Sequence, residues 1–499
     1  MAVVPVVDAL IVGSGFSGLG MAHALQKAGL NNYVILEKAA EVGGTWRENT
    51  YPGCACDVQS HLYSFSFAGN PNWSHVFSPW HEIQAYILAT AQTLNLRQKV
   101  HFNREVQAAH FDEHSGLWNI RCKDGQQYQA RHFIMGTGPL HVPAIPKIKG
   151  LENFRGKVMH SAQWDHSCEL AGKRIASIGT GGSAIQYVPE IAPAAARLDV
   201  YQRTPAWVLP RNERAYTRVE KFLFKAVPPL RQLYRGFIYV KNEMRILPMR
   251  NPAIARLAEL LARIHIRVRV RDAEIRKKLT PDYTIGCKRI LISNRYLPTF
   301  NRSNVQLITE GISEIGENYI QSRDGVRRET DVIILGTGFV TDPREYMQGF
   351  PITGLNGRAL LDAWANGAEA YKGINVAGFP NFHQLVGPNT GTGHSSVIYF
   401  IESQAKYIVD AITQQQKSGA LYLDVKREVQ NAFNEKIQQD LRNTVWSSGC
   451  NSWYQQADGR NFTIWPGTTF AYRRMTRKLD MAAYHVVQHS PALKKQHSA

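Results

Sequence analysis

The sequence predicts an α/β fold that holds two Rossmann-like units and a helical insertion. Three observations lead to this prediction. Glycine-rich turns follow apolar, strand-like runs at residues 13–18 and 179–184, and a basic segment of helical periodicity occupies residues 209–283. With 499 residues, 44% of them hydrophobic, the chain can bury a large core and form two or three domains. We therefore expect a globular protein with more than one domain.

The first unit begins at the amino terminus, where the apolar run VVDALIV precedes the turn GSGFSG and a helical stretch. In such a turn Gly13 allows the tight bend, Gly15 lets a pyrophosphate approach the backbone, and Gly18 lets the helix pack on the strand. The next strand, YVILEK, ends in Glu37, whose carboxylate can accept hydrogen bonds from a ribose. This pattern predicts a site for an adenine dinucleotide without a 2′-phosphate.

The second unit repeats this order with the opposite charge. The strand KRIASIG leads into the turn GTGGSA, and the following strand ends in Arg203, at the same spacing from its first glycine as Glu37. A guanidinium suits a 2′-phosphate, and a neighbouring hydroxyl can add a hydrogen bond, so the pattern indicates NADP. The residues of this unit expected to contact the cofactor are Gly179, Gly181, Ser183, Arg203 and Thr204.

Two dinucleotide sites in one chain favour a tightly held FAD that a visiting NADPH reduces. Two further apolar strands, at 132–140 and 331–342, each run into a GTG turn and are expected to return the chain between the units. We expect residues 1–145 and 381–499 to form the FAD-binding domain, 146–208 and 284–380 the NADP-binding domain, and 209–283 the basic helical insertion.

The net charge of +18 is concentrated in the insertion. From Arg218 to Lys278 there are 16 Lys or Arg residues against 5 Asp or Glu, a surplus of 16 − 5 = 11. Basic residues alternate there with apolar ones at helical spacing, which predicts a solvated helical region whose arginines face water or an anionic cofactor. We expect no nucleic-acid partner, because no nucleic-acid motif accompanies the charge. The alternative is a non-catalytic flavin-binding protein that docks on a membrane surface through this segment.

The cysteines and the amino terminus indicate the cellular compartment in which the protein is expected to work. The six cysteines show no CxxC spacing, which argues against a zinc site, a dithiol redox centre or a disulfide reductase, so no metal is expected. The amino terminus lacks the basic start of a signal peptide, and nowhere do 18 uncharged apolar residues run together. A reducing, cytoplasmic location is therefore expected.

Two longer motifs indicate which kind of flavoprotein with two dinucleotide sites the chain forms. The segment FRGKVMHSAQWD, which is neither a clean helix nor a clean strand, lies just before the second unit, and GGTWRENTYPGCACD spans 43–57. They resemble FxGxxxHxxxWD and GGxWxxxxYPGxxxD, the two signatures of Baeyer-Villiger monooxygenases. The first motif matches at Phe154, Gly156, His160, Trp164 and Asp165, and the second at Gly43, Gly44, Trp46, Tyr51, Pro52, Gly53 and Asp57.

The resemblance implies an enzyme that uses FAD, NADPH and O2 to convert ketones to esters or lactones through a flavin peroxide, with sulfide oxidation as a side activity. In the segment IGCKRILIS it implies that Arg289 stabilises the peroxide and the adduct, and that Lys288 reaches the NADP phosphate. Ile290 stands where many relatives have proline. Asp57 would pair with Arg289, and Trp46 would contact the cofactor.

The same resemblance makes the first motif, with His160 at its centre, a coupling element between domains rather than a source of a catalytic base. Read without the family, it is a structural hinge with aromatic anchors. The turn within 382–396 is expected near the flavin ring, with Asn389 as a cofactor-binding candidate. The alternative enzyme is a flavin-containing N- or S-monooxygenase, against which Trp164 followed by Asp165 argues.

Overall fold

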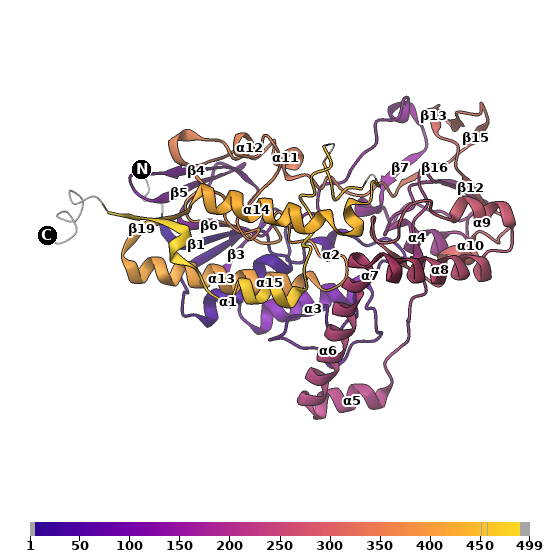
Figure 1. Ribbon diagram of the computed structural model, residues 1–499. Helices are drawn as coiled ribbons and strands as arrows, with labels where there is room; N and C mark the ends of the chain where they lie inside the picture. The colour runs from indigo at the N-terminus through magenta and orange to yellow at the C-terminus, as the bar shows by residue number, and fades with distance from the viewer. Residues whose placement is uncertain (1–4, 451, 457, 490–499) are drawn as a thin grey trace.

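The computed structural model describes residues 5–450, 452–456 and 458–489. The two ends of the predicted FAD-binding domain, 1–4 and 490–499, lie outside this part. Figure 1 shows two sheet-containing bodies side by side, with a pair of helices standing out from them. The predicted α/β class, two nucleotide-type units and a helical insertion, agrees with this architecture.

Among the described residues, eight strands form the first sheet, in the order β17-β4-β5-β6-β1-β2-β3, with β18 also paired to β6. β1 lies parallel to β2 and β6, whereas β4, β5 and β6 form an antiparallel meander. The strands are β1 (Val6–Val12), β2 (Tyr33–Leu36), β3 (Val100–His101), β4 (Val106–Asp112), β5 (Leu117–Cys122), β6 (Gln127–Met135), β17 (Ile352–Thr353) and β18 (Phe382–Gln384).

Side-chain alternation along β1 explains why this strand is apolar from Ala9 to Val12. Leu10 and Val12 pack into the core on one face, while Ala9 and Ile11 pack into the core on the other. Helices cover the sheet, and α1 packs closely on α13. The helices and the small sheet of this body are α1 (Phe16–Lys27), α2 (Thr45–Glu48), α3 (Trp80–Thr93), α11 (Pro343–Tyr346), α12 (Leu360–Ala363), α13 (Val397–Ser418), α14 (Arg427–Arg442), α15 (Thr469–Met475), β19 (Ala420–Val425) and β20 (Tyr484–Gln488).

The chain returns to the first sheet earlier than the boundary predicted at residue 381. β17 already pairs with β4, and the side chains of Leu360, Trp364 and Phe379 pack in the core of the first sheet. The sequence-based boundary followed the later, more apolar strand at 382, and the two-residue β17 is too short to give a periodic signal.

The second sheet is parallel throughout, in the order β12-β9-β8-β16-β7. Its strands and helices are β7 (Lys157–His160), β8 (Arg174–Ile178), α4 (Ala184–Ile191), β9 (Arg197–Tyr201), α10 (Tyr296–Thr299), β12 (Val305–Ile308) and β16 (Val332–Leu335), with the small antiparallel sheet β13 (Ile312–Ile315), β14 (Tyr319–Ser322) and β15 (Arg327–Glu329) beside it. The segment 154–165, predicted as neither helix nor strand, supplies the edge strand β7 and a short 3-10 turn at 161–163.

The insertion begins and ends at one point of the second body. β10 (Val208–Leu209) pairs with β11 (Leu291–Ile292), which brings the two ends of the insertion together. Between them lie α5 (Arg218–Ala226), α6 (Pro228–Glu243), α7 (Leu247–Arg250), α8 (Pro252–Arg269) and α9 (Ala273–Leu279). In Figure 1, α6 runs away from the body and α5 lies at its far end. In the part of the chain described, no helix is long and apolar enough to cross a membrane.

Candidate active site

The first glycine-rich turn is packed so tightly that two of its glycines cannot be replaced without moving the backbone. Gly13 has a φ of +97°, and a Cβ on Gly18 would lie 1.8 Å from the Gly13 carbonyl oxygen. Gly15 faces the backbone of Gly44, which belongs to the motif at 43–57. The turn therefore has the shape expected where a helix begins directly against a pyrophosphate.

Glu37 lies at the end of β2 and is only 4% exposed. Its Oε2 accepts hydrogen bonds from Ser14 N at 2.9 Å and Ser14 Oγ at 2.7 Å, and its Oε1 accepts one from Ala39 N at 3.0 Å. The carboxylate thus stands next to the glycine-rich turn, where the ribose of an adenine dinucleotide would lie. The residues present fit such a cofactor.

The second turn is open. Gly179 has a φ of +108°, but nothing lies within 4 Å of a Cβ placed on Gly181 or Gly182. Ser183 precedes the first residue of α4, so its backbone lies where helix amides face an anion. Thr204 accepts a long hydrogen bond from Thr180 Oγ1 at 3.4 Å through its carbonyl oxygen.

Two predicted cations converge beside this turn. Burial and the positive charge of Arg203 together lower the pKa of Lys288, which places these two side chains in one electrostatic neighbourhood. The Lys288 ammonium also lies over the ring of Tyr283, at 4.9 Å. Neither Arg203 nor Lys288 forms an ion pair with any described carboxylate. The charge of Asp282 opposes this lowering of the pKa, but Asp282 forms no ion pair with Lys288 in the described part of the chain, so the two cations fit the 2′-phosphate of NADP.

Arg289 and Asp57 form the ion pair expected between two segments that are far apart in the chain. Arg289 Nη2 donates to Asp57 Oδ2 at 2.6 Å, and Nε donates to the same oxygen at 3.1 Å. The side chains are 39% and 33% exposed, so both reach solvent. Burial raises the pKa of Asp57, but the Arg289 charge and hydrogen bonds outweigh it and leave the pKa below its ordinary value. The charge of Asp57 in turn raises the pKa of Arg289.

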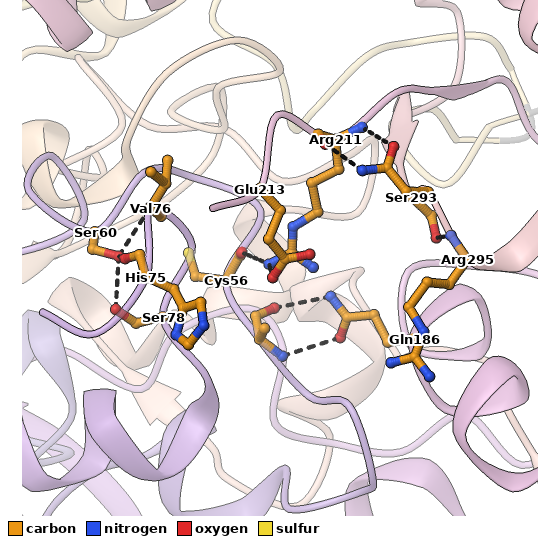
Figure 2. A network of polar contacts seen from close by, with 12 residues as sticks. Cys56, Ser60, His75, Val76, Ser78, Gln186, Arg211, Glu213, Ser293 and Arg295 are labelled. Carbon is orange, nitrogen blue, oxygen red and sulfur yellow. Dashed lines mark hydrogen bonds and ion pairs between the residues drawn. The ribbon is translucent and has the colours of Figure 1, made fainter. Parts of the chain in front are cut away.

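Two further arginines reach this acid, and the sequence analysis did not find them. Both Arg211 and Arg245 interact electrostatically with Asp57. Figure 2 shows Arg211 beside Cys56, whose carbonyl oxygen accepts a hydrogen bond from Arg211 Nη2 at 3.3 Å. Both arginines belong to the predicted basic insertion, where many arginines share one pattern, so no local signal separates them from the others.

The two long motifs meet at α4. Tyr51 of the first-sheet motif donates its hydroxyl to Gln186 Oε1 at 3.0 Å, and Gln186 Nε2 donates to the Ala55 carbonyl at 2.9 Å. Ala55 N also donates to Gln186 Oε1 at 3.3 Å, and Figure 2 shows Gln186 with its two dashed hydrogen bonds. Trp164 of the other motif packs on Tyr51 and Tyr187, with ring centroids 6.5 Å and 5.6 Å apart. This contact joins the two bodies and fits the coupling role predicted for the motif.

His160 ends β7 next to the turn that follows β16. Its Nδ1 accepts a hydrogen bond from Ala162 N at 3.1 Å, and its ring packs edge-on against Phe339 at 6.0 Å. Burial lowers the pKa of His160 and so favours the neutral ring, whereas a hydrogen bond to the Gly338 backbone acts in the opposite direction and raises the pKa. A buried, neutral histidine at a turn between strands fits a positioning role.

The other residues of this motif hold its backbone. Phe154 packs in the core of the second sheet, and a Cβ on Gly156 would lie 2.3 Å from the Asp331 carbonyl oxygen. The hydrogen bond and charge of Lys157 lower the pKa of Asp165, which also accepts hydrogen bonds from Ser167. These contacts are local to the second body.

Two cofactor-binding candidates have protein partners. Trp46 is buried, and its Nε1 donates to Tyr63 Oη at 3.1 Å. Asn389 is also buried, and its Nδ2 donates to the carbonyl oxygens of Asn461 and Ile464 at 2.8 Å and 3.1 Å. The amide of Asn389 thus fixes the carboxyl-terminal loop, and its contact with a cofactor stays a prediction.

Two of the cysteines form a disulfide that the sequence analysis did not predict. Cys287, the residue before Lys288, forms a disulfide with Cys450, 163 positions away. Spacing along the chain could not indicate this pair, because the two cysteines come together only through the tertiary fold. Among the described residues, no group of three or more His, Cys, Asp or Glu side chains could hold a metal ion.

Two nucleotide-type turns followed by side chains of opposite charge, together with the ion pair of Arg289 and Asp57, define an oxidoreductase with two dinucleotide sites. Residues 10–221 match the family described as pyridine nucleotide-disulphide oxidoreductase. A Baeyer-Villiger monooxygenase of Pseudomonas aeruginosa is 48% identical and covers 95% of this chain and 90% of its own length. Another, of Streptomyces coelicolor, is 45% identical and covers 97% and 93%. The chain therefore belongs to the Baeyer-Villiger monooxygenase family.

A solved structure agrees with this assignment. The crystal structure of OTEMO in complex with FAD and NADP is 26% identical, with a TM-score of 0.88, and the match covers 96% of this chain and 99% of that one. The predicted fold class, the family and the monooxygenase class are confirmed. The roles of individual residues stay predictions, and so do the domain boundaries other than the one at residue 381.

Proposed function

We propose that this protein is an FAD-dependent monooxygenase that uses NADPH and O2 to insert one oxygen atom beside the carbonyl of a ketone, giving an ester or a lactone. The observation that carries the proposal is the ion pair of Arg289 with Asp57, which joins the segment after the insertion to the motif at 43–57. Family membership supports the proposal, and so do the two nucleotide turns, one followed by an acid and the other by a base.

When bound, FAD reduced by NADPH supplies the oxygen-activating chemistry. Glu37 and the turn from Gly13 to Gly18 hold its adenosine and pyrophosphate portion. Arg203 and Lys288 hold the 2′-phosphate of NADPH, which is the group that distinguishes it from NADH. FAD and NADPH would thus be held by separate units, with the ion pair of Arg289 and Asp57 between the segments of these units.

Arg289 supplies a fixed positive charge at the meeting point. Asp57 engages its Nε and Nη2 atoms, which leaves Nη1 without a hydrogen-bond partner among the described residues. That donor is available to an oxygen on which negative charge develops during insertion. Because Asp57 raises the pKa of Arg289, the guanidinium stays protonated. The two hydrogen bonds to the carboxylate also fix the plane of the guanidinium group.

The test replaces Arg289 and separates two half-reactions. We expect Arg289→Ala to keep FAD and to keep anaerobic reduction of the flavin by NADPH, whereas ester formation falls by at least about a hundredfold. Product analysis by gas chromatography and anaerobic absorbance measure the two steps. A matched control is Arg295→Ala, because Arg295 lies in the same segment but pairs with Glu190 on the surface.

Undiminished ester formation by Arg289→Ala would remove this residue from the reaction. A ketone that also carries a thioether distinguishes the proposed reaction from that of an N- or S-monooxygenase. The proposal expects the ester as a product of this compound. A sulfoxide as the sole product, with NADPH consumed, would overturn the Baeyer-Villiger assignment in favour of the alternative.

A further inference from the structure

The helical insertion exposes far more apolar surface than any other part of the described chain. Sixteen large apolar residues between Val219 and Val268 are 37% to 74% exposed, whereas seven such residues are exposed elsewhere. We call these sixteen the insertion face: Val219, Phe222, Leu223, Val227, Leu230, Leu233, Phe237, Val240, Met244, Leu247, Ile254, Leu257, Leu260, Leu261, Ile264 and Val268. Scattered exposed apolar residues are ordinary, but a dense set is typical of an interaction surface.

The exposed residues form regular stripes along the two long helices. On α6 they are Leu230, Leu233, Phe237 and Val240, and Met244 directly after the helix continues the row, at alternating steps of three and four. Positions with these steps lie on one side of an α-helix, so the five side chains form a continuous row. Their exposure means that this row points away from the rest of the protein.

α8 repeats the pattern, and its opposite side is buried. The exposed row consists of Ile254, Leu257, Leu261, Ile264 and Val268, again at steps of three and four. The buried residues of the same helix are Ala255, Ala262, His265 and Ile266. The fold therefore already has its packing side on this helix, and the exposed row adds a second apolar side that the core does not use.

Basic residues stand next to the exposed row of α8. Arg256 and Arg267 are exposed and lie, by helical geometry, to one side of the row, whereas Arg263 lies over the ring of the buried Trp207 at 5.2 Å. The acid of this helix, Glu259, is turned inward, where its Oε1 accepts a hydrogen bond from Ile285 N at 2.9 Å. The surplus of 16 − 5 = 11 positive charges between residues 218 and 278 extends this pattern over the whole insertion.

The position of the helices makes the face accessible. Figure 1 shows α6 running away from the two bodies, with α5 at its far end. At that end Val219 and Phe222 are 66% and 68% exposed, beside Arg218 and Lys221. In the same view α8 lies along the second body, with its apolar row exposed. Apolar rows flanked by cations, on accessible helices, are the arrangement with which interfacial helices enter the boundary between headgroups and acyl chains.

We propose that the insertion face docks the protein on a lipid bilayer that carries anionic headgroups, without crossing it. The apolar rows enter the acyl boundary, and the flanking arginines and lysines pair with the headgroup phosphates. A second copy of the chain fits less well, because pairing two such faces would bring two surpluses of positive charge together. The sequence pattern alone predicted a solvated insertion, since it shows the basic residues but not which apolar side remains uncovered.

The test is flotation of the purified FAD-containing protein with vesicles of phosphatidylcholine, with and without phosphatidylglycerol. We expect the protein to float with the anionic vesicles and to be released at high salt, because headgroup contacts are screened. The assay needs no turnover, so its result is independent of the proposed reaction.

Two pairs of substitutions test the face directly. Leu233→Ser with Phe237→Ser shortens the row of α6, and Leu261→Ser with Val268→Ser shortens that of α8. Combining the two pairs is expected to weaken binding to anionic vesicles by at least about tenfold, from the apolar area lost at the interface. The control is Val326→Ser with Phe470→Ser, which removes two apolar side chains exposed outside the face.

A charge pair complements these variants. Arg256→Gln with Arg267→Gln is expected to reduce the dependence on phosphatidylglycerol, whereas Arg121→Gln with Arg442→Gln, on other elements, is not. Retained flavin absorbance and circular dichroism identify the variants that fold. Vesicle binding that is absent, or equal in the face variants and the control, would overturn the proposal. So would a stable dimer, seen by analytical ultracentrifugation, that the face variants dissociate.

Discussion

The two glycine-rich turns are followed, at the same spacing, by an acid in one unit and a base in the other. Glu37 is buried and already bonded to Ser14 and Ala39 of its own unit. Arg203 is exposed and has no ion-pair partner in the described part of the chain. The turns differ as well, although the first glycine of each is tightly packed. Gly18 has no room for a methyl group, whereas Gly182, two positions before the residue equivalent to Gly18, has open space around it.

This contrast indicates different modes of binding. A site whose polar groups are fixed before the ligand arrives loses little conformational entropy on binding and can hold its ligand tightly. A site with an open turn and two unpaired cations gains its main contacts from the ligand itself, and a charged ligand exchanges from such a surface more readily. The first unit therefore suits a resident cofactor, and the second suits one that enters and leaves at each turnover.

The largest expected effect is at the tight turn. Gly18→Ala places a methyl group against the Gly13 carbonyl oxygen and forces the turn apart, so we expect protein without bound FAD and without activity. The flavin absorbance per protein after purification is the measurement. The matched variant is Gly182→Ala, where the added methyl group has no neighbour within 4 Å.

Gly182→Ala should keep its full flavin content and show only a higher KM for NADPH, because the added methyl group would contact NADPH but no protein atom. A full flavin content in Gly18→Ala, or a loss of flavin in Gly182→Ala, would contradict the difference drawn between a closed and an open site.

The second-largest effect is expected when the positive charge of the second unit is removed. Arg203→Ala should raise the KM for NADPH by about ten- to hundredfold, the value of a charge-assisted contact, and leave that for NADH nearly unchanged. Steady-state kinetics with both cofactors measure it, and Arg302→Ala, elsewhere in the same unit, is the control. An equal loss for NADPH and NADH would show that Arg203 does not bind the 2′-phosphate.

The turns and their charges were predictable because they are local. In each unit a strand, three small residues and a terminal charge lie within about thirty residues, and each position has its own steric or electrostatic reason. The pairing of Arg289 with Asp57 joins positions 232 apart, and it was accessible only through the resemblance to a family.

Features that depend on the tertiary fold were not predictable. Helical periodicity identified the insertion, but both sides of α8 are apolar, and the pattern does not show which one is buried. Arg211 and Arg245 approach Asp57 only in the folded chain. The pairing of β17 with β4 and the disulfide have the same origin, because contacts between distant segments leave no periodic signal.

Removing the disulfide between Cys287 and Cys450 should loosen the contact between two distant segments of the chain. This bond ties the segment of Lys288 and Arg289 to the carboxyl-terminal loop, so Cys450→Ser should lower the free energy of unfolding by about 2–4 kcal/mol. Denaturant titration followed by circular dichroism measures it. Cys168→Ser, which changes an unpaired cysteine, is the control. Equal stability of the two variants would show that the disulfide does not hold this junction.

The smallest effect is a pH dependence confined to the open site. Burial and the Arg203 charge lower the pKa of Lys288, so this side chain loses its proton at a lower pH than an ordinary lysine. As the pH rises, the site loses positive charge, and kcat/KM for NADPH should fall relative to that for NADH, by less than about tenfold.

Lys288→Arg should remove this dependence on pH, because a guanidinium stays protonated. Arg203→Ala should move it to higher pH, because the neighbouring charge that favours deprotonation is gone. A ratio that does not change with pH in the unmodified enzyme would mean that the two cations do not share one phosphate, and that the open site distinguishes its cofactor through Arg203 alone.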